Sequence, residues 1–157
     1  MKYTFSILLF FLTNHLFSLD YILEFQANIN ILKEFNISKK EKFRSYEVIG
    51  TFTDKYGNYG KFDGIVTSDV KDSKLIKLEG TAKLIYANDE ELYIKAFRKE
   101  SDFDAGVANM EIIGASDKFR LLIGTNCKQS VRYFKDTIFG LQKCNITKEQ
   151  SEILKSN

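Results

Sequence analysis

The sequence predicts an all-β protein, and within that class a small antiparallel up-and-down β-barrel of about eight strands. The 157 residues include fourteen Phe and eight Tyr, which are residue types that strands favour. From Tyr46 onward, apolar side chains recur at every second position in successive runs that short polar turns separate. Short connections favour hairpins between neighbouring strands, and closure into a barrel removes both exposed sheet edges. A two-sheet sandwich is the alternative.

The first 18 residues have a different character from the rest of the chain. One basic residue, Lys2, precedes an apolar stretch from Phe5 to Phe17, and the small residue Ser18 follows. This layout is typical of a secretory signal peptide, and the stretch is shorter than the roughly 20 residues of a membrane span. We predict a signal peptide over 1–18 and a periplasmic or secreted protein without stable membrane insertion once it is removed. An uncleaved N-terminal anchor is the alternative.

Loss of this segment would remove the only histidine, His15. The remaining chain would have no imidazole for acid–base catalysis or metal binding, and the sequence indicates no catalytic residue, metal site or cofactor. Without Lys2, 22 basic residues stand against 21 acidic ones, a net charge of +1. Such a balance does not indicate binding to nucleic acid or to an anionic membrane surface. The sequence predicts no particular oligomeric state.

The predicted barrel domain covers residues 19–147. Its first part, up to about residue 43, is expected to form one strand followed by a basic, exposed loop. Alternating runs then predict further strands at 46–52, 62–70, 76–86, 92–96, 106–112 and 119–127, before a last hairpin that ends near residue 144. Their inward faces mix large residues with Gly and Ala, which suits a tightly curved sheet. The polar tail, 148–157, is expected to be a short helix or disordered.

Both cysteines lie in the last predicted hairpin. A loop centred on Lys135 and Asp136 places Cys127 directly opposite Cys144, on the inward face. In an exported protein, opposed cysteines predict a disulfide, which would stabilise the fold by about 3 kcal/mol at most. Free or reactive thiols and a metal pair are the alternatives, although the absence of a CxxC motif argues against a metal.

One polar group of residues interrupts the apolar inward pattern. Arg98 occupies the inward position that follows the 92–96 run. A short hairpin loop places Arg98 opposite Asp104 and Ala96 opposite Gly106, with Asp102 in the loop. One interpretation is a salt bridge that closes the barrel rim. Another is a polar mouth where Arg98, Asp104 and Asp102 orient an anionic or hydroxylated ligand that enters an apolar interior. Proton-transfer chemistry is a third.

The stretch from Asp104 to Tyr133, with MEIIGASDKFRLLIG at its centre, resembles allene-oxide-cyclase-like and dirigent-like barrels. In those proteins a strand ends in a turn of the form Gly-Gly-Thr-Gly-Lys-Phe, and the next strand ends at another Gly. Gly114, Lys118 and Phe119 match the turn, and Gly124 closes the next strand. The chain is also similar to small exported bacterial proteins of this type. The resemblance implies an eight-stranded antiparallel barrel with a central cavity, and none of the matching positions is a catalytic residue.

These observations leave two classes of function. The first is non-catalytic binding of a small apolar or amphipathic ligand, or of a partner, by an exported barrel. The second is an isomerase or cyclase of the allene-oxide-cyclase kind, which guides a reactive molecule by the shape of its cavity. A roomy cavity with inward polar groups would favour the enzyme, whereas a filled interior with an exposed apolar patch would favour a partner-binding protein.

Overall fold

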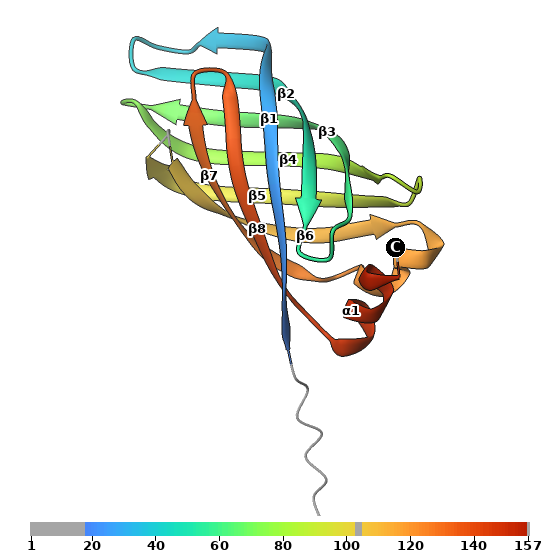
Figure 1. Ribbon diagram of the computed structural model, residues 1–157. Coiled ribbons are helices and arrows are strands. Elements are labelled where there is room, and N and C mark those ends of the chain that lie inside the picture. Colours follow the sequence, from blue (N-terminus) through green and yellow to red (C-terminus); the bar gives the residue numbers. More distant parts are fainter. Residues whose placement is uncertain (1–17, 103–104, 157) are drawn as a thin grey trace, which may run out of the picture.

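The computed structural model describes residues 18–102 and 105–156, which form a closed antiparallel barrel (Figure 1). The strands are β1 (Leu19–Asn36), β2 (Glu41–Asp54), β3 (Tyr59–Lys71), β4 (Lys74–Tyr86), β5 (Glu91–Asp102), β6 (Ala105–Ala115), β7 (Asn126–Phe134) and β8 (Thr137–Ile146). A 3₁₀ helix, η1 (Asp117–Leu122), precedes β7, and a helix, α1 (Lys148–Lys155), follows β8. Each strand pairs with its neighbour in sequence, and β1 pairs with β8. The predicted barrel is therefore confirmed.

Of the predicted signal peptide, 1–18, residues 1–17 lie outside the described part of the chain and only Ser18 is described. Within the described residues, no helix is long and apolar enough to cross a membrane.

Buried and exposed side chains alternate along the strands, which separates a packed interior from a solvent-exposed exterior. In β2, Tyr46, Val48 and Phe52 are buried, whereas Ile49 between them is about half exposed. The buried side chains form two clusters, of which the larger lies around Phe119 and the smaller around Tyr46. Burying one face of each strand is what fixes the register of a closed sheet.

One end of the barrel, hereafter the closed end, is covered by η1 and α1 (Figure 1). Thr147 begins α1 with a capping box, in which its hydroxyl accepts from Gln150 N and its own N–H donates to the Gln150 side chain. Gln150 Nε2 also donates to Leu121 O of η1 at 2.7 Å. Asn58 of the β2–β3 turn donates to Leu154 O at 2.8 Å. The predicted polar tail is thus a helix that joins two loops.

The segment predicted as a strand at 119–127 is instead mostly η1, and β7 begins only at Asn126. Phe119 and Leu122 are buried, while Leu121 and Ile123 are about half exposed. Burial at a spacing of three fits a 3₁₀ turn and contradicts the predicted alternation. The physical reason lies in a distant strand, because the Phe119 ring packs edge-on against Tyr86 of β4, with centroids 4.9 Å apart.

The other end, hereafter the open end, carries the β1–β2, β3–β4 and β7–β8 connections (Figure 1). Here β1 pairs with β8 only as far as Asn28, opposite Thr137, but continues to Asn36 alongside β2. The first hairpin therefore projects past the β7–β8 turn (Figure 1). The basic loop expected after β1 is only the short turn 37–40, because β2 begins at Glu41.

Candidate ligand cavity

An apolar cavity of about 90 Å³ lies inside the barrel. Small residues on four successive strands make the room for it: Gly64, Gly80, Ala82, Ala96 and Ala108. Larger apolar side chains complete the wall, among them Phe25, Val48, Phe62, Val66, Met110 and Ile138. The inward glycines and alanines that the sequence analysis linked to curvature thus also hollow the interior. An engineered cavity of about 150 Å³ holds a benzene molecule, so this one accommodates a shorter apolar group.

Arg98 is the charged side chain among the described residues that line the cavity, and it is 2% exposed. Its guanidinium lies against Gly106 of β6, where an added Cβ would come within 2.3 Å of Arg98 Cζ. Only a residue without a side chain leaves space for the guanidinium at this place. The prediction that Arg98 points inward is therefore confirmed, and Gly106 is the position that accommodates it.

The Tyr46 side chain brings further polar groups to the same region. Burial and the neighbouring Tyr133 hydroxyl raise the pKa of Tyr46, whereas Arg98 and Ser68 act in the opposite direction. Tyr46 is therefore a neutral hydroxyl at physiological pH and can donate a hydrogen bond. With the guanidinium, this end of the cavity presents donors, which suit a carboxylate or another anionic group.

Ser68 of β3 is buried at 2% exposure beside Tyr46. Its Oγ has no hydrogen-bond partner of good geometry among the described residues. A buried hydroxyl in that state costs free energy that a bound polar group could recover. Gln129, at an inward position on β7, also lines the cavity. The interior thus has unused capacity for hydrogen bonding on its polar side.

A second hollow of about 270 Å³, hereafter the mouth groove, lies at the open end. It is lined by Ile29, Ile31, Arg44, Tyr46, Tyr133, Lys135 and Asp136. Tyr46 and Tyr133 line both hollows, and so stand between the mouth groove and the cavity. A ligand that reaches the cavity from this end passes these two rings.

The predicted register of the β5–β6 hairpin is wrong for the described pairs. β5 pairs with β6 so that Ala96 lies opposite Met110, four residues from the expected Gly106. The offset is already present at Phe97, which pairs with Asn109, so the hairpin turns two residues later than predicted. The β-bulge between Tyr93 and Ile94 changes the pairing by only one further residue.

Of the two predicted acidic partners, Asp104 lies outside the described residues. Asp102 ends β5, with its backbone opposite Lys74 of β4. The Asp102 side chain is likewise outside the described part of the structure, so the predicted contacts of Arg98 with the two carboxylates stay predictions.

The rim does carry an ion-pair cluster, but on another hairpin. Glu34 of β1 contacts both Arg44 and Lys42 of β2, with Lys42 Nζ 3.3 Å from Glu34 Oε1. Hydrogen bonding from Arg44 is the main reason that the pKa of the Glu34 carboxyl lies below its usual value. This cluster borders the mouth groove through Arg44.

The alternating sequence pattern does not indicate the polar roles of Tyr46, Ser68 and Tyr133. Tyr46 and Tyr133 occupy inward positions of their strands, where an alternating pattern alone treats an aromatic ring as part of an apolar wall. Ser68 stands at an inward position between Val66 and Val70, and a polar residue in such a place was the available signal. The pattern of a single strand does not indicate that residues from β2, β3, β5 and β7 meet at one end of the cavity.

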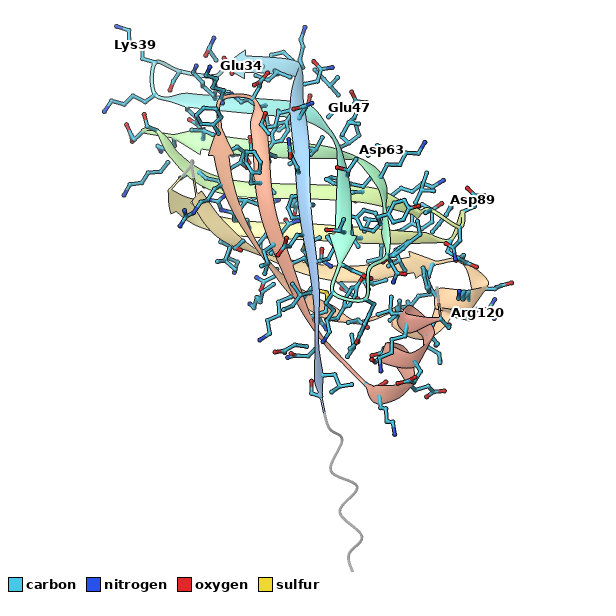
Figure 2. All side chains as sticks on the ribbon, in the orientation of Figure 1. Glu34, Lys39, Glu47, Asp63, Asp89 and Arg120 are labelled. Carbon is cyan, nitrogen blue, oxygen red and sulfur yellow. A yellow bond between two sulfur atoms is a disulfide. The ribbon has the colours of Figure 1, made fainter. Side chains whose placement is uncertain are left out.

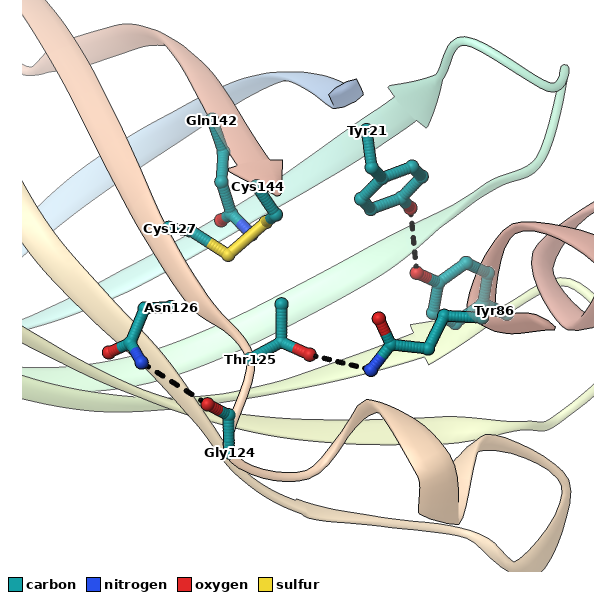
Figure 3. Close-up of a disulfide and its surroundings, with 9 residues drawn as sticks. Tyr21, Tyr86, Gly124, Thr125, Asn126, Cys127, Gln142 and Cys144 are labelled. Atoms are coloured by element: carbon teal, nitrogen blue, oxygen red, sulfur yellow. Dashed lines mark hydrogen bonds between the residues drawn. A yellow bond between two sulfur atoms is a disulfide. The ribbon is translucent and has the colours of Figure 1, made fainter. Parts of the chain in front are cut away.

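The disulfide is formed in the predicted register. Cys127 lies opposite Cys144 on β7 and β8, and their sulfur atoms are 2.00 Å apart. Figure 3 shows the bond with Gln142 beside it, whose Nε2 lies 3.3 Å from Cys144 Sγ and 3.6 Å from Cys127 Sγ. Both sulfurs are buried, and Tyr21 lies opposite Cys144 on β1. The cross-link is therefore part of the core near the closed end.

Among the described residues, no group of three or more His, Cys, Asp or Glu is arranged to hold a metal ion. No protein-family model matches the chain, and searches of curated proteins and of solved structures find no match.

Proposed function

We propose that this chain is an exported protein whose barrel binds a small amphipathic ligand without catalysis. An apolar part of the ligand would occupy the cavity, and a polar or anionic part would contact Arg98 and the Tyr46 hydroxyl. The observation that carries the proposal is an apolar cavity of about 90 Å³ next to a buried guanidinium. Export is supported by the layout of residues 1–18 and by the disulfide, a bond that persists in oxidising compartments.

The energetic cost of the cavity supports a role in binding. Protein interiors are normally packed as densely as organic crystals. A hollow costs roughly 24 cal/mol per Å³, so about 90 Å³ costs about 2 kcal/mol. Larger residues at Ala96 or Ala108 would recover part of this free energy. A sequence that keeps small residues on four adjacent strands forgoes that stability, and a ligand would restore it.

An isomerase or cyclase guided by cavity shape is the second candidate, and the resemblance to allene-oxide-cyclase-like barrels is its support. Two features favour simple binding over it. Pockets for drug-sized ligands typically measure about 300–1,000 Å³, well above the cavity here. The described residues that line the cavity also include no His, Asp or Glu to transfer a proton.

Filling the cavity tests the proposal. Ala96 lies opposite Gly80, so Ala96→Leu has room for its added carbons in the hollow. We expect at least a tenfold loss of affinity for a short straight-chain carboxylate such as butanoate, measured by isothermal titration calorimetry. Unfolding in urea should show unchanged stability or a gain of up to about 2 kcal/mol. The matched control is Ala87→Leu in the exposed β4–β5 turn, which should bind as the natural chain does.

Two results would contradict the cavity as the binding site. One is equal butanoate binding by Ala96→Leu and the natural chain. The other is the absence of calorimetric binding by the natural chain across straight-chain carboxylic acids and alcohols of four to ten carbons.

Arg98→Gln tests the recognition of the charged group. A hydrogen bond to a charged group contributes about 1.5–3 kcal/mol, so we expect affinity for a carboxylic acid to fall about 10- to 100-fold. Affinity for the alcohol of equal length should change little, and its binding also reports that the barrel is intact. Arg44→Gln, in the mouth groove, is the control with an intact interior. Equal losses for acid and alcohol would show that Arg98 shapes the cavity and does not select an anion.

A further inference from the structure

The hairpin that projects at the open end, residues 30–45, concentrates the positive charge of the chain. It is hereafter the protruding hairpin. It contains five basic residues, Lys33, Lys39, Lys40, Lys42 and Arg44, and two acidic ones, Glu34 and Glu41. Its net charge is +3, whereas the whole chain carries +2, so the remaining residues sum to −1. The positive charge is therefore unevenly distributed in a chain whose net charge is close to zero. Figure 2 shows Lys39 at the tip of this hairpin.

The protruding hairpin also exposes large apolar side chains. Ile31, Leu32, Phe35 and Ile37 are each between 51% and 61% exposed. The neighbouring β7–β8 turn adds Phe134, at 66% exposed the most exposed large apolar side chain among the described residues. Single exposed apolar residues are ordinary, but five at one end of a molecule indicate a surface that contacts something apolar.

These apolar side chains lie on both faces of the hairpin and at its tip. Ile31 lines the mouth groove together with Arg44. Phe43 alternates with Arg44 and so points to the other face, where its ring lies 6.4 Å from that of Phe35. Ile37 begins the turn. A flat protein interface would cover only one of these faces, whereas the soft boundary of a lipid bilayer can surround a projecting hairpin.

Cationic side chains are interleaved with the exposed rings. Lys33 Nζ lies 5.6 Å from the centre of the Phe35 ring, and Lys135 Nζ lies 5.6 Å from that of Phe134. Lysine stems can lie along apolar surface while the ammonium groups reach phosphate groups. Peripheral membrane-binding elements have this composition: their apolar side chains insert at the boundary of the acyl chains, and their lysines contact the lipid headgroups.

We infer that the protruding hairpin, with the adjacent β7–β8 turn, docks onto the surface of a bilayer that contains anionic phospholipid. Ile31 and Arg44 belong to both the hairpin and the mouth groove, so docking turns the entrance of the cavity toward the lipid. An amphipathic molecule could then pass between bilayer and cavity without crossing water. The docking surface extends the proposed function but can be tested without any ligand.

The test is co-sedimentation with vesicles, using protein purified as the cell exports it, so that its N-terminus is in its natural state. Vesicles of phosphatidylcholine alone are compared with vesicles that contain 30% phosphatidylglycerol, each at 50 and 500 mM NaCl. We expect binding to the anionic vesicles at low salt, and at least tenfold weaker binding to the neutral vesicles or at high salt.

Variants then locate the contact. Each lysine near an anionic surface contributes about a fivefold change in partitioning, so Lys39→Gln with Lys40→Gln should weaken binding about 25-fold. Ile37→Ser should also weaken it, whereas Ile65→Ser, at an outward position of β3 with similar exposure, should not. Ala96→Leu should bind vesicles as the natural chain does, which separates this surface from the cavity.

Three results would overturn the inference: no binding at low salt, equal binding to neutral and anionic vesicles, or binding that neither hairpin variant weakens. Sedimentation velocity adds a fourth. A dimer that the hairpin variants dissociate would show that a second copy of the chain, and not lipid, covers this surface.

Discussion

Asp54→Ala is expected to lower the free energy of unfolding by about 4 kcal/mol, since it removes a buried charged acceptor and leaves its donors without a partner. The Asp54 carboxylate is 9% exposed and accepts four hydrogen bonds of 2.9 Å. The donors are the Tyr21 hydroxyl, the backbone N–H groups of Tyr56 and Asn58, and Asn58 Nδ2. The measurement is equilibrium unfolding in urea.

The size of this effect follows from what Asp54 connects. Tyr21 belongs to β1, and its hydroxyl also lies 3.1 Å from that of Tyr86 on β4. Asn58 continues the network to Leu154 of α1. One carboxylate therefore joins β1, the β2–β3 turn and the helix at the closed end. Asp63→Ala, at an exposed position on β3, is the control and should change stability by less than about 0.5 kcal/mol. A loss below 1 kcal/mol for Asp54→Ala would show that water replaces the carboxylate.

The double change Cys127→Ala and Cys144→Ala is expected to cost about 3 kcal/mol, the value for a cross-linked loop of about 15 residues. The disulfide spans 17 positions and is buried in the core. For a chain of this size, the loss corresponds to a melting temperature lower by about 6–12 °C. Gln142 also loses both sulfur neighbours, so its amide adds to the cost.

Calorimetry of the natural chain with and without a reducing agent is the parallel measurement, because reduction removes the bond and keeps the sulfur atoms. We expect reduction to lower the melting temperature less than the double substitution does. A melting temperature that neither treatment moves would mean that the closed end holds its shape without the cross-link.

The alternation of apolar and polar residues predicts the fold wherever the strands are regular. Cys127 and Cys144 are opposed as expected because β7 and β8 pair without a shift. The rule fails where a bulge intervenes. Alternation along 76–86 assigns Ile76 to the inward face, but the register shifts next to it, so Ile76 is 40% exposed and Leu75 is 1% exposed. A bulge depends on how the whole sheet twists and closes, which a local pattern does not contain.

The candidate site could be predicted only in part, for a related reason. The pattern along β5 indicates that Arg98 faces the interior, since that follows from its own strand. Its neighbours Tyr46 and Ser68 come from other strands, and their approach depends on the stagger of the closed barrel. The cavity likewise depends on small residues from four strands that meet at one level. Alternation along a strand indicates which face of the sheet each side chain occupies. It does not indicate the position of that side chain along the barrel axis.

The pairing of β1 with β8 sets the order in which the protein can assemble. The ladder from Leu19, opposite Ile146, to Asn28, opposite Thr137, joins the first strand to the last. Hairpins from β2 to β7 can form locally as the chain is synthesised. The β1–β8 pairing can form only after the C-terminal residues have been made, and contacts between residues so far apart in sequence form slowly. A chain truncated before β8 would keep two raw strand edges, the kind that pairs with other chains and aggregates. Chains that lack their last twenty or so residues would therefore be the products most prone to aggregate.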